Sequence, residues 1–350
     1  MTEALLEIEG AGASHGDGPG HRMRLYSVRD QKLVALPQEA ASLQEAIWID
    51  MLRPTGEDEA VVESALGVDV PTKDEMQEIE VSSRLYLDGE AAFMTAIVLS
   101  RTDADDAVSA PVTFILAGPR LLTVRYEEPR VFTTFPDRAQ KTAIGCVDAE
   151  SVLIGLLEAI TDRLSDILER LGLELDILSR DIFSPETPKA KKSRKPRSSA
   201  DYQRILETIG RKYGLASNIR DSLVTLSRLA SFFLNVAQQR RASKDLTARI
   251  KAFARDTDAL SEHVDSISQK IIFLLDATLG LVNIEQNTII KLFSVAAVIF
   301  LPPTLVASIY GMNFEFMPEL SWALGYPFAI GLMIISAVIP YLFFKRKGWL

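Results

Sequence analysis

Residues 292–314 read LFSVAAVIFLPPTLVASIYGMNF, and residues 320–344 read LSWALGYPFAIGLMIISAVIPYLFF. The two stretches contain 23 and 25 residues, and neither holds a formal charge. Because a helix rises about 1.5 Å per residue, each stretch can cross a hydrocarbon core of about 30 Å. The sequence therefore predicts a membrane protein with two C-terminal transmembrane helices, which argues against a purely soluble enzyme.

Basic residues beside the two spans predict their orientation. Lys291 precedes the first span and residues 345–347 are Lys-Arg-Lys, whereas the loop between the spans carries only Glu315 and Glu319. Positively charged flanks favour the cytoplasmic side. We therefore expect a multi-pass protein of the cell inner (plasma) membrane, with both termini cytoplasmic and a short acidic loop outside.

Composition excludes several classes of function. The chain has 38 basic and 47 acidic residues and a net charge of -9, which argues against nucleic acid as a partner. A single cysteine, Cys146, excludes an intrachain disulfide framework and a cysteine-based zinc site, and the three histidines lack ligand spacing. No nucleophile, base and orienting group can be drawn together, and no phosphate loop of the GxxxxGK[ST] type is present. An enzyme is the weakest interpretation.

Hydrophobic patterns and turn signals divide the chain. Strand-like runs flank Asp88-Gly89 and Gly118-Pro119, which predict two hairpins, and a helical pattern begins after Pro136. The predicted order is a disordered tail at 1–21, a cytoplasmic α/β domain at 22–145, a helical hairpin at 146–243 with a basic loop at 184–199, a stem helix continuing into the first span at 244–310, an external loop at 311–319, the second span at 320–344 and a basic tail at 345–350.

The stem helix is the longest predicted element. Residues 244–301 contain no proline and one glycine, Gly280. If continuous, these 58 residues form a helix about 87 Å long, which needs neighbouring helices, and several copies of the chain would supply them. The predicted fold class is an α+β cytoplasmic domain, a mixed sheet with flanking helices, followed by long stem helices and the two spans.

The loop between the spans carries a motif. Residues 311–320 read GMNFEFMPEL, and the Gly311-Met312-Asn313 triplet followed by Met-Pro-Glu-Leu resembles the CorA divalent-cation channels. Further segments resemble the same family: WID (48–50), EIEVSSRL (78–85), VNIEQN (282–287), FLPPTLVAS (300–308) and YLFFKRKGWL (341–350). The resemblance covers about residues 251–350 and, upstream, 46–127, whereas the basic segment 189–197 has no counterpart that we can place.

The resemblance implies a homopentamer with one pore on the fivefold axis. It implies potential-driven uptake of hydrated Mg2+, with Co2+ and Ni2+ as other permeants, and no required cofactor. Gly311, Met312 and Asn313 would form the selectivity filter, where neutral carbonyl oxygens of Asn313 hold the water shell that Mg2+ sheds reluctantly. Glu315 and Glu319 would gather cations outside, although they fit equally well as ordinary solvated loop acids.

The first span also has a predicted pore-lining stripe. One face, at alternating three- and four-residue steps, carries Asn287, Ile290, Ser294, Ala297, Leu301, Thr304 and Ser308. Small and polar residues on one stripe suit a narrow, partly wet axis. By family position, Asn287 and Thr304 would form polar rings, and Ile290, Phe293 and Leu301 would form hydrophobic constrictions.

Regulation is expected from the resemblance as well, since Mg2+ bound between cytoplasmic subunits holds the pore of this family shut. Asp88 resembles one ligand of that site, although an Asp-Gly pair is more often only a turn. Counting back from Asn287 places its partner on Ala252, whose side chain cannot bind a cation, so Asp256, one turn later, is the nearest substitute.

Two other functions stay open. One is a zinc transporter on the same scaffold, as in the ZntB branch, but that branch departs from the FEFMPEL loop at 314–320. The other is a membrane-tethered sensor without transport, which predicts a monomer or dimer and no effect of changing Asn313. The expected partners are further copies of the chain, divalent cations and the lipid bilayer, with Mg2+ as substrate and regulatory ligand.

Overall fold

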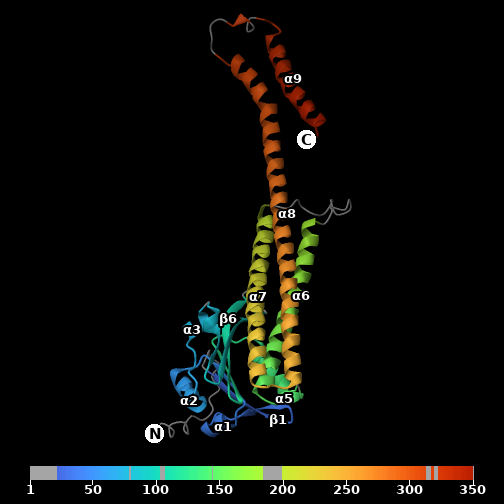
Figure 1. Ribbon diagram of the computed structural model, residues 1–350. Coiled ribbons are helices and arrows are strands. Elements are labelled where there is room, and N and C mark those ends of the chain that lie inside the picture. Colours follow the sequence, from blue (N-terminus) through green and yellow to red (C-terminus); the bar gives the residue numbers. More distant parts are fainter. Residues whose placement is uncertain are drawn as a thin grey trace. The chain divides into compact units, whose positions relative to one another are not determined.

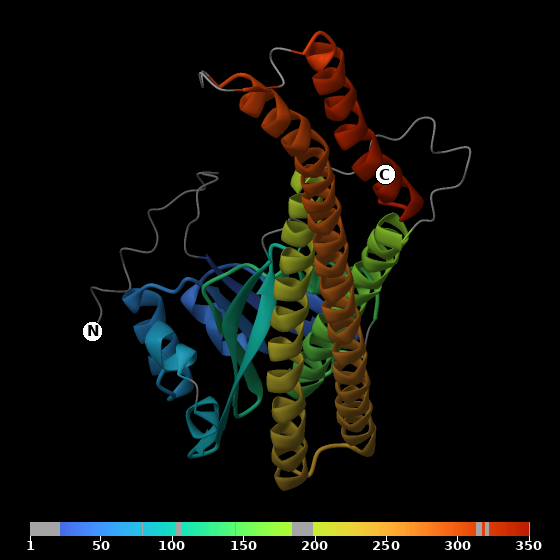
Figure 2. The ribbon, with the colours of Figure 1, turned by 90° about the horizontal axis from the view of Figure 1, so that it is seen from above.

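The computed structural model describes residues 22–78, 80–102, 107–143, 145–183, 199–312, 317–318 and 322–349 (Figures 1 and 2). The chain divides into two compact units, residues 1–184 with 208–272, and residues 185–207 with 273–350. The first unit contains a mixed sheet with flanking helices, and the second contains the apolar helices. The predicted fold class is confirmed.

Seven strands form one sheet in the order β2-β1-β3-β7-β6-β5-β4. Neighbours are antiparallel, except that β3 and β7 run parallel. The strands are β1 (Arg22–Arg29), β2 (Lys32–Leu36), β3 (Trp48–Leu52), β4 (Leu85–Asp88), β5 (Ala91–Ser100), β6 (Val108–Ala117) and β7 (Arg120–Arg125). The two hairpins predicted from their turn pairs are β4–β5 and β6–β7, and Gly89 and Gly118 adopt positive φ values of 56° and 55° in their turns.

Helices cover both faces of the sheet (Figure 2). Because side chains alternate along a strand, β3 sends Ile49 and Met51 into a core with Val62, whereas Trp48 points to the other face and meets the ring of Phe135 edge-on at 6.1 Å. The short helices are α1 (Ala40–Glu45), α2 (Gly56–Leu66), α3 (Lys73–Gln77) and α4 (Val81–Arg84). The other face meets α5 (Val131–Lys141) and α6 (Ala149–Phe183).

The β1–β2 hairpin has no strong sequence signal. Its turn residues Asp30 and Gln31 both have positive φ values, of 51° and 59°. Such a turn is usually marked by Asn-Gly or Asp-Gly, because glycine adopts positive φ without steric cost. Without that glycine, β2 was not predicted.

The helical pattern was predicted to begin after Pro136, and the structure places a helix before it as well: α5 begins at Val131, so that Pro136 lies inside it. Proline has no N–H to donate to the carbonyl four residues before it, which here belongs to Phe132. The Arg24 guanidinium donates to that carbonyl at 3.1 Å instead. A side chain from a distant strand therefore allows the helix to run through its proline.

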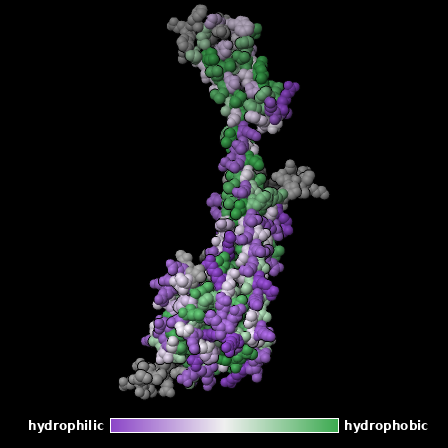
Figure 3. Space-filling view, viewed as in Figure 1, coloured by the Kyte–Doolittle hydropathy of each residue, from purple (hydrophilic) through white to green (hydrophobic). Residues whose placement is uncertain are grey.

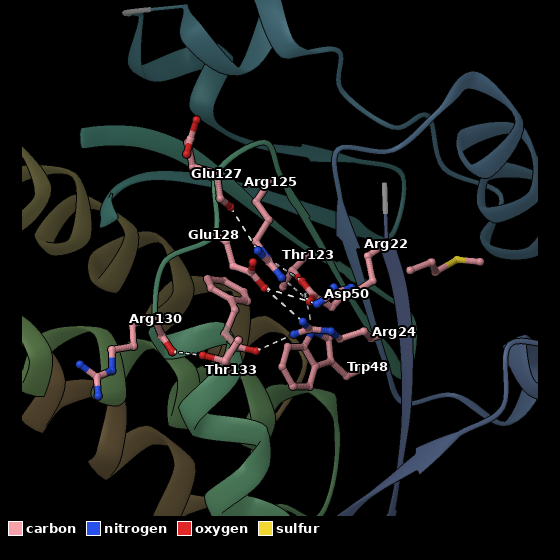
Figure 4. A network of polar contacts seen from close by, with 12 residues as sticks. Arg22, Arg24, Trp48, Asp50, Thr123, Arg125, Glu127, Glu128, Arg130 and Thr133 are labelled. Carbon is pink, nitrogen blue, oxygen red and sulfur yellow. Dashed lines mark hydrogen bonds and ion pairs between the residues drawn. The ribbon is translucent and has the colours of Figure 1, made fainter. Parts of the chain in front are cut away.

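An ion pair lies in the sheet interior (Figure 4). The side chains of Arg125 and Asp50 are 0% and 1% exposed. Arg125 donates from Nε to Oδ1 of Asp50 at 3.0 Å and from Nη2 to Oδ2 at 2.8 Å, and the Thr123 hydroxyl donates to Oδ1 at 2.8 Å. Nη1 of Arg125 donates to the Glu127 carbonyl at 3.1 Å, and the guanidinium lies 4.6 Å from the Phe132 ring centroid. Both buried charges are therefore paired and hydrogen-bonded, as burial requires.

Within the first unit, α6 packs beside α7 (Ser199–Gln239) and the first part of α8 (Lys244–Tyr310). Apolar residues spaced three and four apart fill the contact, as the sequence of 152–182 predicts. Ion pairs join the helices: Arg249 with Glu158, Lys212 with Glu174, Arg220 with Asp265 and Lys270 with Asp176.

Helix α7 also covers an edge of the sheet. Strand β4 pairs only with residues 91–94 of β5, so among the described residues the rest of β5 has no strand on that side. There the Ser222 hydroxyl donates to the Ile97 carbonyl at 2.6 Å, and the Thr225 hydroxyl accepts from the Ile97 N–H at 2.9 Å. Ile97 stands opposite Pro111 of β6 in a pair whose backbone groups point away from each other, so the missing N–H of Pro111 costs no hydrogen bond between them. Two side chains of α7 thus make the hydrogen bonds to Ile97 that a neighbouring strand would otherwise make.

The second unit consists mainly of the end of α8 and of α9 (Gly325–Arg346). Both helices are long and apolar enough to cross a membrane, and 6% of the most apolar segment of each is buried within the chain. Figure 3 shows hydrophobic residues over their surface. Helix α9 begins at Gly325 rather than at the predicted 320, and Pro327 falls in its first turn, where a missing N–H costs nothing. It includes Lys345 and Arg346, predicted as tail, because cations suit the last turn of a helix.

Candidate cation pathway

The predicted pore-lining residues lie on one side of α8. Between residues 287 and 308, a helix of 3.6 residues per turn places the stripe and Phe293 within an arc of about 120°. All eight side chains are exposed in the single chain: Asn287, Ile290, Phe293, Ser294, Ala297, Leu301, Thr304 and Ser308. Phe293 and Leu301 are 73% and 65% exposed. An exposed row of this kind is available to line a pathway or to meet a neighbouring molecule.

On the opposite side of the same helix, exposure is mixed. Val295, about 140° away from the middle of the stripe, is buried, with 2% exposure, whereas Leu292 on the same side is 61% exposed. On the stripe itself, the Thr304 hydroxyl donates to the Phe300 carbonyl at 2.7 Å. That bond uses the hydroxyl proton and leaves the oxygen lone pairs outward, so Thr304 can only accept a further hydrogen bond.

Helix α8 ends just before the predicted filter. The Gly311 N–H donates to the Ala307 carbonyl at 2.9 Å, and a Cβ atom at Gly311 would lie 3.1 Å from that oxygen. Glycine therefore permits a close approach that a larger residue would strain. Met312 follows with 46% exposure. The key residue Asn313 and the loop acids Glu315 and Glu319 lie outside the described residues.

Asp88 lies at the end of β4, exposed, and lines an acidic cavity of about 440 Å³. Three further carboxylates line the same cavity, from Asp69, Glu75 and Glu78. Burial, reinforced by the charges of Glu75, Asp88 and Asp69, raises the pKa of Tyr86 there. The backbone N–H and the hydroxyl of Thr72 bind Glu75 and lower its pKa, so that this carboxylate serves as a helix cap.

Asp256 lines a different cavity, of about 290 Å³, with Glu158 and Asp162 of α6. Partial burial raises the pKa of Asp162, Arg138 opposes this shift, and the carboxylates of Glu158, Asp166 and Asp256 reinforce it. Glu158 accepts two hydrogen bonds from Arg249, at 3.0 and 2.6 Å. Its charge is therefore already compensated within the chain.

The two predicted regulatory residues are not brought together in one chain, since they line different cavities. Among the residues that the structure describes, no group of three or more His, Cys, Asp or Glu side chains is arranged to hold a metal ion. The acidic neighbours of Asp88 and Asp256 were missed by sequence reasoning, because most are distant in sequence. Only the four-residue spacing of Glu158 and Asp162 gives a signal, that of a shared helix face.

Comparison with known proteins identifies close relatives. The family described as CorA-like Mg2+ transporter protein matches residues 44–346. The chain is 34% identical over 325 residues to the magnesium transport protein CorA of Haemophilus influenzae, a match that covers 93% of this chain and 99% of the relative.

Solved structures share the fold. The CorA magnesium transporter from Methanocaldococcus jannaschii matches with a TM-score of 0.71 at 19% identity, over 94% of this chain and 98% of that one. The ZntB cytoplasmic domain from Vibrio parahaemolyticus matches with a TM-score of 0.52 at 9% identity, over 74% and 97%. At these identities the likeness concerns the fold alone, and the zinc branch is the more distant of the two.

Proposed function

The chain belongs to the family of CorA-like Mg2+ transporter proteins, and from this premise we propose that it forms a homopentameric channel for Mg2+. Members of the family are transporters, not enzymes. In the proposed assembly, five copies of α8 surround one axis and turn the exposed stripe inward. The observation that carries the proposal is that this stripe, from Asn287 to Ser308, is polar or small at five of its seven positions and is not covered within one chain.

The proposed filter recognises the hydrated ion. Mg2+ holds its water tightly, so a pore that accepts hydrogen bonds from that water avoids the cost of removing it. Five Asn313 side chains at the mouth would supply neutral carbonyl oxygens for this task. Five carboxylates in the same place would bind the dication more strongly and slow its release. Gly311 would support the filter because, without a Cβ atom, it can lie close to the Ala307 carbonyl at the end of α8. Met312 would pack beneath the filter.

The membrane potential supplies the driving force in this proposal. A dication that crosses about 100 mV gains about 4.6 kcal/mol, twice the value for one elementary charge. Inward movement therefore needs no nucleotide. Co2+ and Ni2+ have the same charge and also travel as hydrated ions, so they are proposed as further permeants. Asn287 and Thr304 would form polar rings on the path, and Ile290, Phe293 and Leu301 would narrow it.

Regulation by cytoplasmic Mg2+ is proposed to require two copies of the chain. Asp88 and Asp256 each lie beside further carboxylates, and a dication could join such surfaces from adjacent subunits. Loss of Mg2+ would then release one subunit from the next. The basic residues 345–347 favour cytoplasmic termini, which would place this regulation inside the cell, with the protein in the inner membrane.

The test is Mg2+ uptake into proteoliposomes with an imposed inside-negative potential. Asn313→Ala removes the carbonyl acceptor from all five copies of the proposed pentamer and should lower uptake about tenfold or more, since the loss of about 1.4 kcal/mol, comparable to one hydrogen bond, already corresponds to tenfold. Asn235→Ala, an exposed asparagine on α7, is the matched control and should transport normally.

Other outcomes would replace the proposal. Correctly inserted protein that carries Zn2+ with protons but no Mg2+ would identify the zinc transporter. Protein that carries no cation and runs as a monomer or dimer would identify a tethered sensor.

A further inference from the structure

We propose that the basic end of α9, together with Lys291 of α8, binds the phosphate of an anionic phospholipid headgroup. This inference goes beyond the transport of Mg2+. It requires only that the two apolar helices lie in a membrane, so it can be tested by binding, without any measurement of transport.

The end of α9 is an ordered turn. Gly348 has φ 69°, its N–H donates to the Lys345 carbonyl at 3.2 Å, and the Trp349 N–H donates to the Phe344 carbonyl at 3.1 Å. The Trp349 ring stacks on Phe344 with centroids 5.3 Å apart. These bonds and this contact form a Schellman motif, which fixes the residue after the glycine. They also occupy carbonyl oxygens that would otherwise face an approaching anion.

The ordered turn brings the ends of the two spans together. Nζ of Lys291, on α8, lies 6.0 Å from the centroid of the Trp349 ring, within the range of a cation–π contact. Nζ of Lys345 lies at the same distance from the ring of Tyr341. Tryptophan and tyrosine are enriched where a span meets the headgroups. The cluster therefore has the composition of a membrane boundary.

The charges of this cluster are not compensated in the described part of the chain. Lys291, Lys345, Arg346 and Lys347 are all exposed, and none of them takes part in an ion pair there. Glu285, the acidic residue before Lys291 in sequence, lies more than a helical turn away. Four exposed cations without an ion-pair partner in the described residues make this boundary attractive to an anion.

Phospholipid phosphate has the required chemistry and position. The guanidinium of Arg346 can donate hydrogen bonds to two phosphate oxygens, and the lysine ammonium groups add positive charge. The acyl chains of the same lipid would lie along the apolar surface of α9, where Leu342 and Phe343 are 51% and 57% exposed. A free phosphate would satisfy the charges but leave this apolar surface uncovered, which favours the lipid.

Native mass spectrometry of the full-length protein, released from mixed micelles of phosphatidylglycerol and phosphatidylcholine, tests the site. The wild type should retain phosphatidylglycerol selectively. Lys291→Gln should weaken its binding about fivefold, the effect of one charge near an anionic surface. Lys251→Gln, an equal charge change on the charged part of α8, should have no effect. Lys291→Gln leaves residues 345–347 to fix topology, and protease accessibility confirms the orientation.

Trp349→Ala changes no charge and should also weaken retention, because the ring positions Lys291, whereas Trp349→Phe should keep most of it. Equal retention of phosphatidylcholine would overturn the proposal. So would full displacement of phosphatidylglycerol by inorganic phosphate, which would identify a general anion site, or an unchanged affinity in both Lys291→Gln and Trp349→Ala.

Discussion

The interior of the sheet buries charged side chains, whereas the surface of the spans exposes apolar ones. Asp50 and Arg125 are charged, yet they are 1% and 0% exposed, and their polar groups find partners in the same chain. Phe293 and Leu301 are apolar, yet 73% and 65% exposed. The first unit buries and pairs these two charges within one chain. The second exposes a large apolar surface, which lipid or further copies of the chain must cover.

The largest effect is expected from breaking the ion pair. Arg125→Met leaves Asp50 as a buried charge without its partner and should lower the free energy of unfolding by about 3–5 kcal/mol. Hydrogen exchange of the β3 and β7 amides in the full-length protein measures the loss. Combining it with Asp50→Leu should recover most of the stability, because no buried charge remains.

The control is Arg101→Met, since Arg101 is 59% exposed in its pair with Glu127. This change should cost less than about 1 kcal/mol. If Arg125→Met lowered the free energy of unfolding no more than Arg101→Met does, the stability of the sheet would not depend on its buried ion pair.

The second prediction compares two equally exposed apolar residues. Ile335 on α9 and Leu173 on α6 are 55% and 59% exposed. Ile335→Lys should disfavour membrane insertion by about 3 kcal/mol, because it places a charge near the centre of a span. Leu173→Lys should change stability by no more than about 0.5 kcal/mol. Insertion is measured by glycosylation of tagged termini, and equal insertion of both variants would show that α9 does not meet lipid.

A smaller effect concerns the single cysteine. Cys146 is 1% exposed, and burial raises the pKa of its thiol from 9.0 to about 11, with Asp148 adding to the shift and Arg249 opposing it. The folded state holds this proton more tightly, so its contribution to stability is complete below pH 9 and is lost as the pH rises towards 11.

At pH 8, iodoacetamide should therefore alkylate the folded protein about 100-fold more slowly than the urea-unfolded chain. Leu173→Cys in a Cys146→Ser background provides an exposed thiol, which should react at the unfolded rate. Rapid alkylation of native Cys146 would mean that the first unit opens without unfolding.

Local signals in the sequence predicted many of the elements, but not their arrangement. The Asp88-Gly89 pair predicts its hairpin because glycine is needed at positive φ. The parallel pairing of β3 with β7, by contrast, joins residues such as Trp48 and Leu121 that no local pattern links. The continuation of α5 through Pro136 depends on Arg24, a residue of strand β1. Such contacts are properties of the tertiary fold, and periodicity does not contain them.

The candidate pathway likewise has a part that could be predicted from the sequence and a part that could not. The stripe on α8 follows from helical spacing alone, and its common face could be predicted residue by residue. The partners of Asp88 and Asp256 could not, because they come from other elements and, in the proposed assembly, from other copies. Glu158 illustrates the difficulty, since its pairing with Arg249 spans 91 positions of sequence.

The covered edge of β5 matters most where several sheets are held close together. A strand edge with free N–H and C=O groups is a template for a neighbouring chain, and the local concentration within an oligomer would make such pairing fast. Ser222 and Thr225 occupy the groups of Ile97 that would begin it. At this part of β5, the sheets of the proposed assembly therefore offer no free backbone groups for pairing with a strand of a neighbouring copy.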